Sequence, residues 1–241
     1  MSHKIEFVGL AMAYRNDTWV QEFLKTPGRD AFSFHYYSGP RSSRSDPAQF
    51  EQMIADVDTN LLAAAAAIVA TRNRMSPKTK IYVDEVGTIL PHDNDPGVAQ
   101  PSGEYYQASG AMFAYTFARL AQLGVEAVMM SQLVGSPAID SPGCRVPDPQ
   151  YPSVSMFDYE TEAGNARADV LRILLADFKA GATQFAATAS DGPVFVQGIV
   201  TGGGACKALL VNRLAKMFVG VSVNGNTFAL DPFEVRIVDI H

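Results

Sequence analysis

The sequence is poor in cysteine and has no concentration of positive charge. Its 241 residues include two cysteines, Cys144 and Cys206, and their spacing does not predict whether they pair, so the redox compartment stays open. Lysines and arginines number 19 against 25 aspartates and glutamates, scattered along the chain, for a formal net charge of −6. Because nucleic-acid-binding proteins usually carry a concentrated basic face, we expect no nucleic-acid partner.

Long hydrophobic runs are also absent. The longest apolar run, residues 61–70, is rich in alanine, and it is about half as long as the roughly twenty residues that a membrane span needs. We therefore interpret it as the buried face of a helix and expect no contact with a membrane. Residues 1–5 have no apolar core of the signal-peptide kind, so no signal peptide is expected in this chain.

The composition is that of a globular protein, with 47% hydrophobic and 10% aromatic residues. Up to about residue 183, short β-branched or aromatic segments alternate with helical patterns. Strands are expected at residues 5–12, 31–37, 80–86 and 125–133, and helices at 18–25, 47–74, 104–123 and 165–178. This alternation predicts an α/β fold of parallel strands with helices outside.

The last part of the chain has a different pattern. Short strand-like segments at residues 194–200, 207–212, 219–223, 227–230 and 235–240 are separated by glycine-rich turns. The Asn224-Gly225 pair is a strong hairpin signal. We therefore divide the chain into an α/β domain at residues 1–183 and a small antiparallel β-domain at residues 184–241.

Polar side chains follow the expected parallel strands at the points where the strands end. They are Tyr14 and Asn16 after the first, His35 and Tyr37 on the second, Glu85 on the third, and Ser131 and Gln132 on the fourth. The carboxyl ends of parallel strands meet at one edge, where α/β proteins place their chemistry. This collection is compatible with a hydroxyl-rich ligand.

Strand alternation separates the adjacent acids Asp84 and Glu85. Ile81, Val83 and Glu85 share one face of the strand, and Tyr82 and Asp84 share the other. Because barrel interiors favour branched aliphatic residues, we expect Glu85 on the interior face and Asp84 toward the helices.

The same parity predicts that Ser33, His35 and Tyr37 point into the interior and that Phe32, Phe34 and Tyr36 face the helices. Three alternatives stay open: Glu85 caps a neighbouring loop, His35 forms a structural hydrogen bond, or Tyr37 is simply an aromatic residue at a strand end. The acidic segment 92–95 lacks the calcium-loop spacing, so we expect neither a metal nor a cofactor.

Several segments resemble family 39 of the glycoside hydrolases. Residues 7–11 (FVGLA), 19–24 (WVQEFL) and 32–37 (FSFHYY) are similar to its fifth and sixth strand regions. Residues 81–87 (IYVDEVG) are similar to the seventh strand with its nucleophilic glutamate, 127–132 (AVMMSQ) to the eighth strand, and 209–212 with 230–235 to the closing β-domain. The resemblance implies a retaining glycosidase with a (β/α)8 barrel, a carbohydrate substrate and Glu85 as nucleophile. His35, Tyr37, Gln132, Tyr14 and Asn16 would then bind the substrate.

Two departures from the family pattern matter. Relatives often place a sugar-stacking tryptophan where this chain has Gln132, and the chain has no Asn-Glu pair to supply the acid/base residue. We therefore expect an incomplete barrel, strands five to eight plus the β-domain, that is a fragment of the family's catalytic domain and inactive alone. The alternatives are a non-catalytic carbohydrate-binding or scaffold protein, and half-barrels working as a dimer. A xylosidic substrate and an extracellular location are implied by the resemblance alone.

Overall fold

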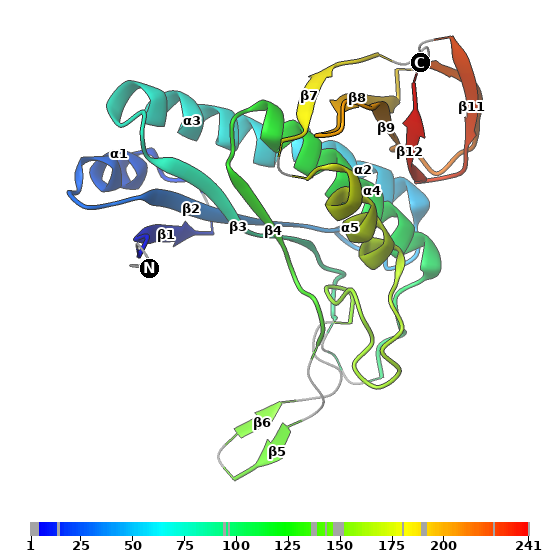
Figure 1. Cartoon of the computed structure of the whole chain (residues 1–241). Helices are drawn as coiled ribbons and strands as arrows, with labels where there is room; N and C mark the ends of the chain where they lie inside the picture. Colours follow the sequence, from blue (N-terminus) through cyan, green and yellow to red (C-terminus); the bar gives the residue numbers. More distant parts are fainter. Residues whose placement is uncertain are drawn as a thin grey trace.

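The computed structural model describes residues 5–13, 15–93, 95, 97–135, 139–142, 144–146, 152–179, 181–188, 192–223 and 225–240. Its first part contains a parallel sheet in the order β1-β2-β3-β4. The strands are β1 (Val8–Met12), β2 (Ala31–Ser38), β3 (Lys80–Thr88) and β4 (Ala127–Met130). All four expected parallel strands are therefore present (Figure 1).

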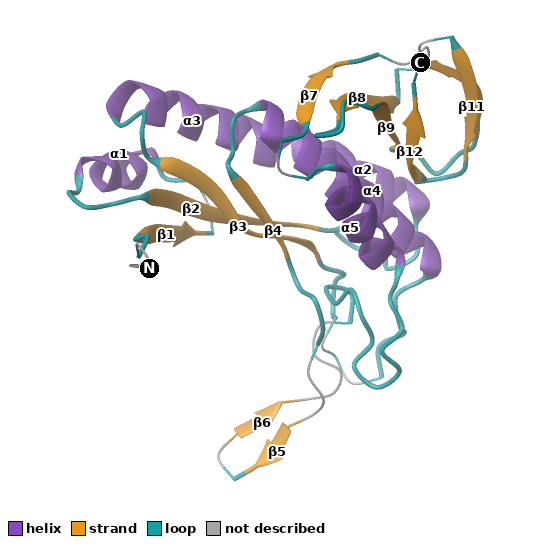
Figure 2. Ribbon diagram, viewed as in Figure 1, coloured by secondary structure: helices purple, strands orange, loops and turns teal. Residues whose placement is uncertain are grey.

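The helices form a layer against one face of this sheet (Figure 2). They are α1 (Asp17–Lys25), α2 (Pro47–Asp56), α3 (Ala63–Met75), α4 (Gly103–Gln122) and α5 (Ala166–Asp177), with a π-helical segment, η1 (Val57–Leu62), between α2 and α3. Side chains of Asn16, Asp46, Ser102 and Asn165 accept hydrogen bonds from backbone N–H groups at the starts of α1, α2, α4 and α5. These caps fix where the four helices begin.

The run Pro47–Met75 is long and apolar enough to cross a membrane by length and composition alone. Its apolar stripe, which includes Phe50, Ile54, Leu61 and Ile68, is buried in the core between the helices and the sheet. The expectation of a buried helix face at residues 61–70 is thus confirmed for Leu61 and Ile68.

The C-terminal part is an antiparallel sheet in the order β12-β9-β8-β7, with the hairpin β10–β11 beside it. Its strands are β7 (Thr183–Ala186), β8 (Val194–Val200), β9 (Cys206–Asn212), β10 (Phe218–Val223), β11 (Asn226–Leu230) and β12 (Val235–Asp239). The sequence predicts all of these except β7, which spans the boundary expected between residues 183 and 184. The short hairpin of β5 (Ile139–Ser141) and β6 (Cys144–Val146) was also not expected.

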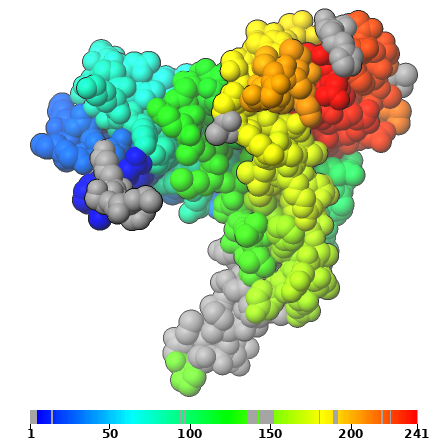
Figure 3. Space-filling model, in the orientation of Figure 1, coloured from blue at the N-terminus to red at the C-terminus, as the bar shows by residue number. Residues whose placement is uncertain are grey.

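Both faces of the strands β8 and β9 are covered. Val196 and Leu210 pack with β10 and β11, whereas the alternate residues Phe195 and Val211 pack with the helices. The ring of Phe195 lies edge-on to Tyr115 of α4, with centroids 5.0 Å apart. The β-domain therefore extends the core of the α/β part, and in Figure 3 it lies at the end of the molecule away from the blue β1.

Candidate active site

A β-bulge at the carboxyl end of β3 decides which acids share a face. Phe32 pairs with Ile81 and Phe34 with Val83, but the next pair is His35 with Glu85, so Asp84 is the extra residue. Such an extra residue leaves two residues of one strand opposite one residue of the next. The pairing of β3 with β4 shifts over the same stretch.

The bulge corrects the face assigned to several residues of β3. Ile81 and Val83 are fully buried in the core under the helices, so their expected place on the interior face is wrong. Glu85 nevertheless lies on the opposite, open face, because the bulge reverses the alternation after Val83. Asp84 was expected to face the helices and instead lies next to His35, on the open face. On β2 the parity needs no correction: Phe32 and Phe34 are in the core.

Tyr37 connects Glu85 to β4. The Tyr37 hydroxyl lies 2.8 Å from Oε2 of Glu85 and 2.5 Å from Oγ of Ser131. A carboxylate only accepts hydrogen bonds, so Tyr37 donates to Glu85, and Ser131 can donate to the Tyr37 oxygen in turn. The hydrogen-bond chain from Ser131 through Tyr37 to the accepting Glu85 joins three adjacent strand ends and holds the Glu85 carboxylate, which is exposed to solvent.

The protonation state of Tyr37 suits this role. Partial burial is the largest effect and raises the pKa of the Tyr37 hydroxyl; the hydrogen bond with Ser131 opposes it, and the neighbouring Glu85 carboxylate raises the pKa further. The phenol therefore stays protonated, and able to donate, over the whole neutral range.

His35 and Asp84 form a second pair on the same face. Nδ1 of His35 lies 3.8 Å from Oδ1 of Asp84, and both side chains are largely buried. Oδ1 of Asp84 makes no hydrogen bond within the described residues. Strand alternation did not identify Asp84 as a site residue, because no local sequence signal marks a bulge inside a regular apolar-polar alternation.

The other expected site residues lie in different surroundings. Oδ1 of Asn16 accepts a hydrogen bond from the backbone N–H of Trp19 at 3.1 Å, so it caps α1. Nε2 of Gln132 donates to Oγ of Ser155 at 3.0 Å, which ties the end of β4 to the loop before α5. Tyr14 lies outside the described residues. Substrate binding by these three side chains stays a prediction.

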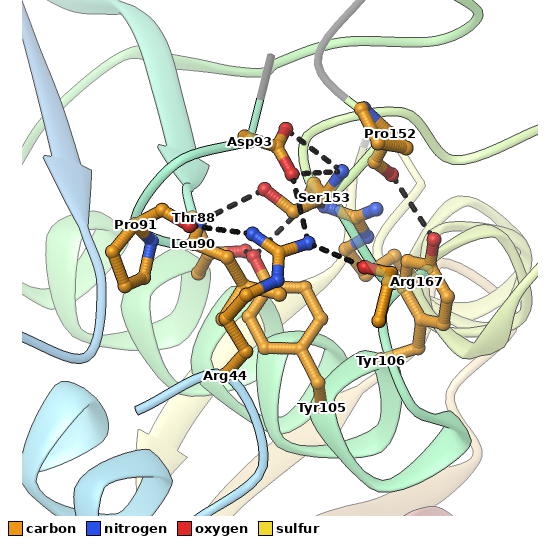
Figure 4. A network of polar contacts seen from close by, with 11 residues as sticks. Arg44, Thr88, Leu90, Pro91, Asp93, Tyr105, Tyr106, Pro152, Ser153 and Arg167 are labelled. Atoms are coloured by element: carbon orange, nitrogen blue, oxygen red, sulfur yellow. Dashed lines mark hydrogen bonds and ion pairs between the residues drawn. The ribbon is translucent and has the colours of Figure 1, made fainter. Parts of the chain in front are cut away.

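A buried polar network supports the loops at this edge of the sheet (Figure 4). The guanidinium of Arg167 on α5 is fully buried and donates to the backbone oxygens of Ser153 and Ser155. Burial lowers the pKa of Arg167 from its usual value. Asp93 accepts from the backbone N–H of Ser153 at 3.1 Å and pairs with Arg44 at 3.4 Å. The loops after β2, β3 and β4 are thereby joined.

In the part of the chain that the structure describes, no three His, Cys, Asp or Glu residues cluster closely enough to hold a metal ion. Within segment 92–95, His92 pairs with Asp95 across 2.9 Å, and Asp93 belongs to the network around Ser153. The chemistry available at the strand ends is therefore that of one exposed carboxylate, held by a phenol, beside a largely buried imidazole–carboxylate pair.

Comparisons by sequence found no match: no family model and no curated protein matches this chain. Comparison of the structure does find similar folds. A family 51 arabinofuranosidase from Xanthomonas axonopodis pv. citri aligns with 100% of this chain and 54% of its own, at 15% identity and a TM-score of 0.68. An α-L-arabinofuranosidase from Thermotoga maritima aligns with 97% of this chain and 57% of its own, at 12% identity and a TM-score of 0.57.

A β-porphyranase of family 86 from Bacteroides plebeius is a third similar structure, covering 99% of this chain and 48% of its own, at 14% identity and a TM-score of 0.56. The chain thus spans about half the length of these enzymes. At such low identity the likeness shows the fold alone, and membership of family 39 stays a prediction. The chain has a glycosidase-like fold, consisting of part of a TIM-barrel-like domain and a β-domain.

Proposed function

We propose that this chain supplies the nucleophile-bearing half of a retaining glycoside hydrolase, with Glu85 as the nucleophile. The observation that carries the proposal is the position of the Glu85 carboxylate. It is exposed at the carboxyl end of β3, on the sheet face that the helices leave open, and it accepts a hydrogen bond from Tyr37. A nucleophilic carboxylate must be ionised and accessible, and a donated hydrogen bond stabilises the ionised form.

Retention of configuration needs a second carboxyl group across the scissile bond, about 5–5.5 Å from the first, to protonate the leaving oxygen. Among the residues that the structure describes, Asp84 is a second carboxyl group on this part of the open face. It adjoins Glu85 on the same strand, so the two acids approach a sugar from the same side. A single copy of the described half-barrel therefore lacks the acid, and we expect it not to cleave glycosides whose leaving group needs protonation.

The substrate class follows from the comparisons and the resemblance together. Two of the similar structures are arabinofuranosidases, and family 39 implies xylosidic substrates. We therefore propose a glycoside of a pentose sugar, and α-L-arabinofuranosides and β-D-xylosides are the first substrates to test.

The nucleophile can be tested without the missing acid. 2-Deoxy-2-fluoro-α-L-arabinofuranosyl and 2-deoxy-2-fluoro-β-D-xylosyl donors with a dinitrophenolate leaving group need no protonation, and the fluorine slows hydrolysis of the product. We expect covalent addition of a glycosyl group, detected by intact mass spectrometry, on the peptide that contains Glu85. Glu85→Gln should abolish the label, whereas Glu126→Gln, at the opposite end of its strand, should keep it.

Labelling of another residue, or equal labelling of Glu85→Gln, would refute the assignment of the nucleophile. The alternative of a non-catalytic carbohydrate-binding protein predicts a different pattern. Such a protein would bind arabinose or xylose saturably, with or without Glu85→Gln, and would never become labelled.

A further inference from the structure

The parallel sheet has an uncovered face and two unpaired edges within the described residues. β1 pairs only with β2, and β4 only with β3, while the helices cover just one face. The other face carries large apolar side chains on its outer strands: Val8 and Leu10 of β1 are 48% and 42% exposed, and Met129 of β4 is 46% exposed. Exposed strand edges and apolar patches of this kind mark surfaces that become covered.

We propose that two copies of this chain close one eight-stranded barrel and that each copy contributes its Glu85 to a single shared site. The proposal rests on the function proposed above and names the source of the missing acid.

The two unpaired edges of the sheet, β1 and β4, can pair with each other across two copies. All four strands run in the same direction, so a two-fold rotation about the barrel axis brings β1 of each copy beside β4 of the other as a parallel pair. Both free edges are then paired at once. The same rotation places Val8 and Leu10 of one copy next to Met129 of the other, inside the barrel, where apolar side chains fill the interior.

The number of parallel strands in two copies also matches that of a TIM barrel. The similar glycosidases are about twice as long as this chain, which aligns with 54% of one and 57% of another. Two copies carry eight parallel strands, the number that closes a TIM barrel. Beyond Met130 the chain pairs with the segment before α5, through Gln132 and Val154 for example, so the edge that is free to pair is that of β4 itself, Ala127–Met130.

The two-fold axis brings two glutamates together. Glu85 lies on the third of four strands, so the two Glu85 residues occupy diametrically opposite strands at the same end of the barrel. Strands about 4.8 Å apart and tilted about 36° enclose an eight-stranded barrel about 15 Å wide. Each carboxyl group extends several ångströms inward from its strand, so the pair comes near the roughly 5–5.5 Å separation of retaining glycosidases.

This pair can complete the reaction. Glu85 of one copy attacks the anomeric carbon, while Glu85 of the other gives its proton to the departing oxygen, which leaves as the alcohol. Water then attacks the same carbon, loses a proton to the second Glu85 and releases the sugar from the first. The sum is glycoside plus water to sugar plus alcohol, and two facing carboxyl groups favour the singly protonated state that this needs.

The assembly is tested first on the full chain by light scattering. We expect twice the chain mass of 26.0 kDa. Leu10→Lys and Met129→Lys should each give the monomer, because they place a charge at the strand contact. Met217→Lys, which changes an exposed side chain of the β-domain, should remain a dimer. A monomeric wild type, or a dimer that neither edge variant weakens, overturns the proposal.

A disulfide distinguishes this dimer from any other. With both native cysteines replaced by serine, Leu10→Cys combined with Met129→Cys should oxidise to a covalent dimer. Within one copy these two residues are three strands apart, about 14 Å, which is too far for a disulfide. Only monomer on a non-reducing gel would contradict the arrangement.

The shared site is tested by mixing wild type with an equal amount of Glu85→Gln under exchange conditions. If both glutamates act in one site, arabinofuranoside turnover per mole of total chain should fall to about one quarter of the wild-type value, because only one dimer in four keeps both glutamates. A fall to one half means independent sites and overturns the proposal. Labelling of Glu85 in a monomer would leave the proposed function intact, whereas a dimer without labelling would refute that function and keep the assembly.

Discussion

At the scale of single residues, Tyr37 is the group that holds Glu85. Tyr37→Phe keeps the ring and removes the hydroxyl that donates to the carboxylate at 2.8 Å. We expect the rate of labelling by the fluoroglycosyl donor to fall about tenfold, equivalent to about 1.4 kcal/mol, at the low end for a hydrogen bond to a charged group because the site is open to water. Tyr36→Phe is the matched control, since Tyr36 belongs to the opposite face. Equal rates for Tyr37→Phe and wild type would remove Tyr37 from the site.

Gly87 gives a second, independent way to disturb Tyr37. A Cβ atom at position 87 would lie 2.5 Å from Cε1 of Tyr37 and 3.3 Å from the backbone oxygen of Ser131. Gly87→Ala should therefore push the Tyr37 ring away from Glu85 and slow labelling about as much as Tyr37→Phe does. Gly103→Ala meets no atom within 4 Å and serves as the control. The combination of Gly87→Ala with Tyr37→Phe should be no slower than either variant alone, and full additivity would show that the glycine acts by another route.

The position of Glu85 was predictable from the sequence, although the reason differs from the one that alternation suggests. Strict alternation puts Ile81, Val83 and Glu85 on one face, yet Ile81 and Val83 are buried under the helices. The residues around Asp84 keep the regular apolar-polar alternation, so the sequence does not reveal the bulge, which moves every following side chain to the other face. The His35–Asp84 pair could not be anticipated for the same reason.

At the scale of whole elements, the buried Arg167 connects α5 to the loop that follows β4. Arg167→Met keeps the apolar part of the side chain and removes donors to two backbone oxygens. Both oxygens retain one partner, from Tyr105 and Asn165, so we expect a loss of about 2 kcal/mol in the free energy of unfolding in urea. Arg172→Met, on the exposed side of the same helix, should change it by less than about 0.5 kcal/mol. Equal losses would mean that burial of the Arg167 guanidinium is not what stabilises the loop.

Elements with strong local signals were predictable to within a few residues, and those set by tertiary contacts were not. The helix starting at Pro47 has an Asp-Pro cap and a regular apolar stripe, and its start at Pro47 is confirmed. Its interruption by η1 has no local signal, since Val57–Leu62 reads as ordinary helix. β7 has little sequence signal of its own and forms because β8 offers it an edge: Thr183 pairs with Val200.

At the scale of the whole molecule, the α/β part and the β-domain share one core. Ile199, Leu209 and Val211 of the β-domain belong to the same buried cluster as the helices and the parallel sheet. Phe195 contributes a ring to this contact, edge-on to Tyr115, and the backbone N–H of Ala215 donates to Glu51 of α2 at 2.7 Å. The division expected at residues 183/184 therefore does not predict two independent folding units.

This shared core can be tested with the single tryptophan of the chain, Trp19 on α1. Phe195→Ala removes a half-buried ring from the contact and should lower the free energy of unfolding by about 2–3 kcal/mol, less than for a fully buried phenylalanine. Because unfolding is cooperative across one core, the Trp19 fluorescence transition should shift together with the far-ultraviolet circular dichroism. Met217→Ala, at an exposed position of the β-domain, should shift neither. An unchanged Trp19 transition in Phe195→Ala would show that the β-domain unfolds on its own.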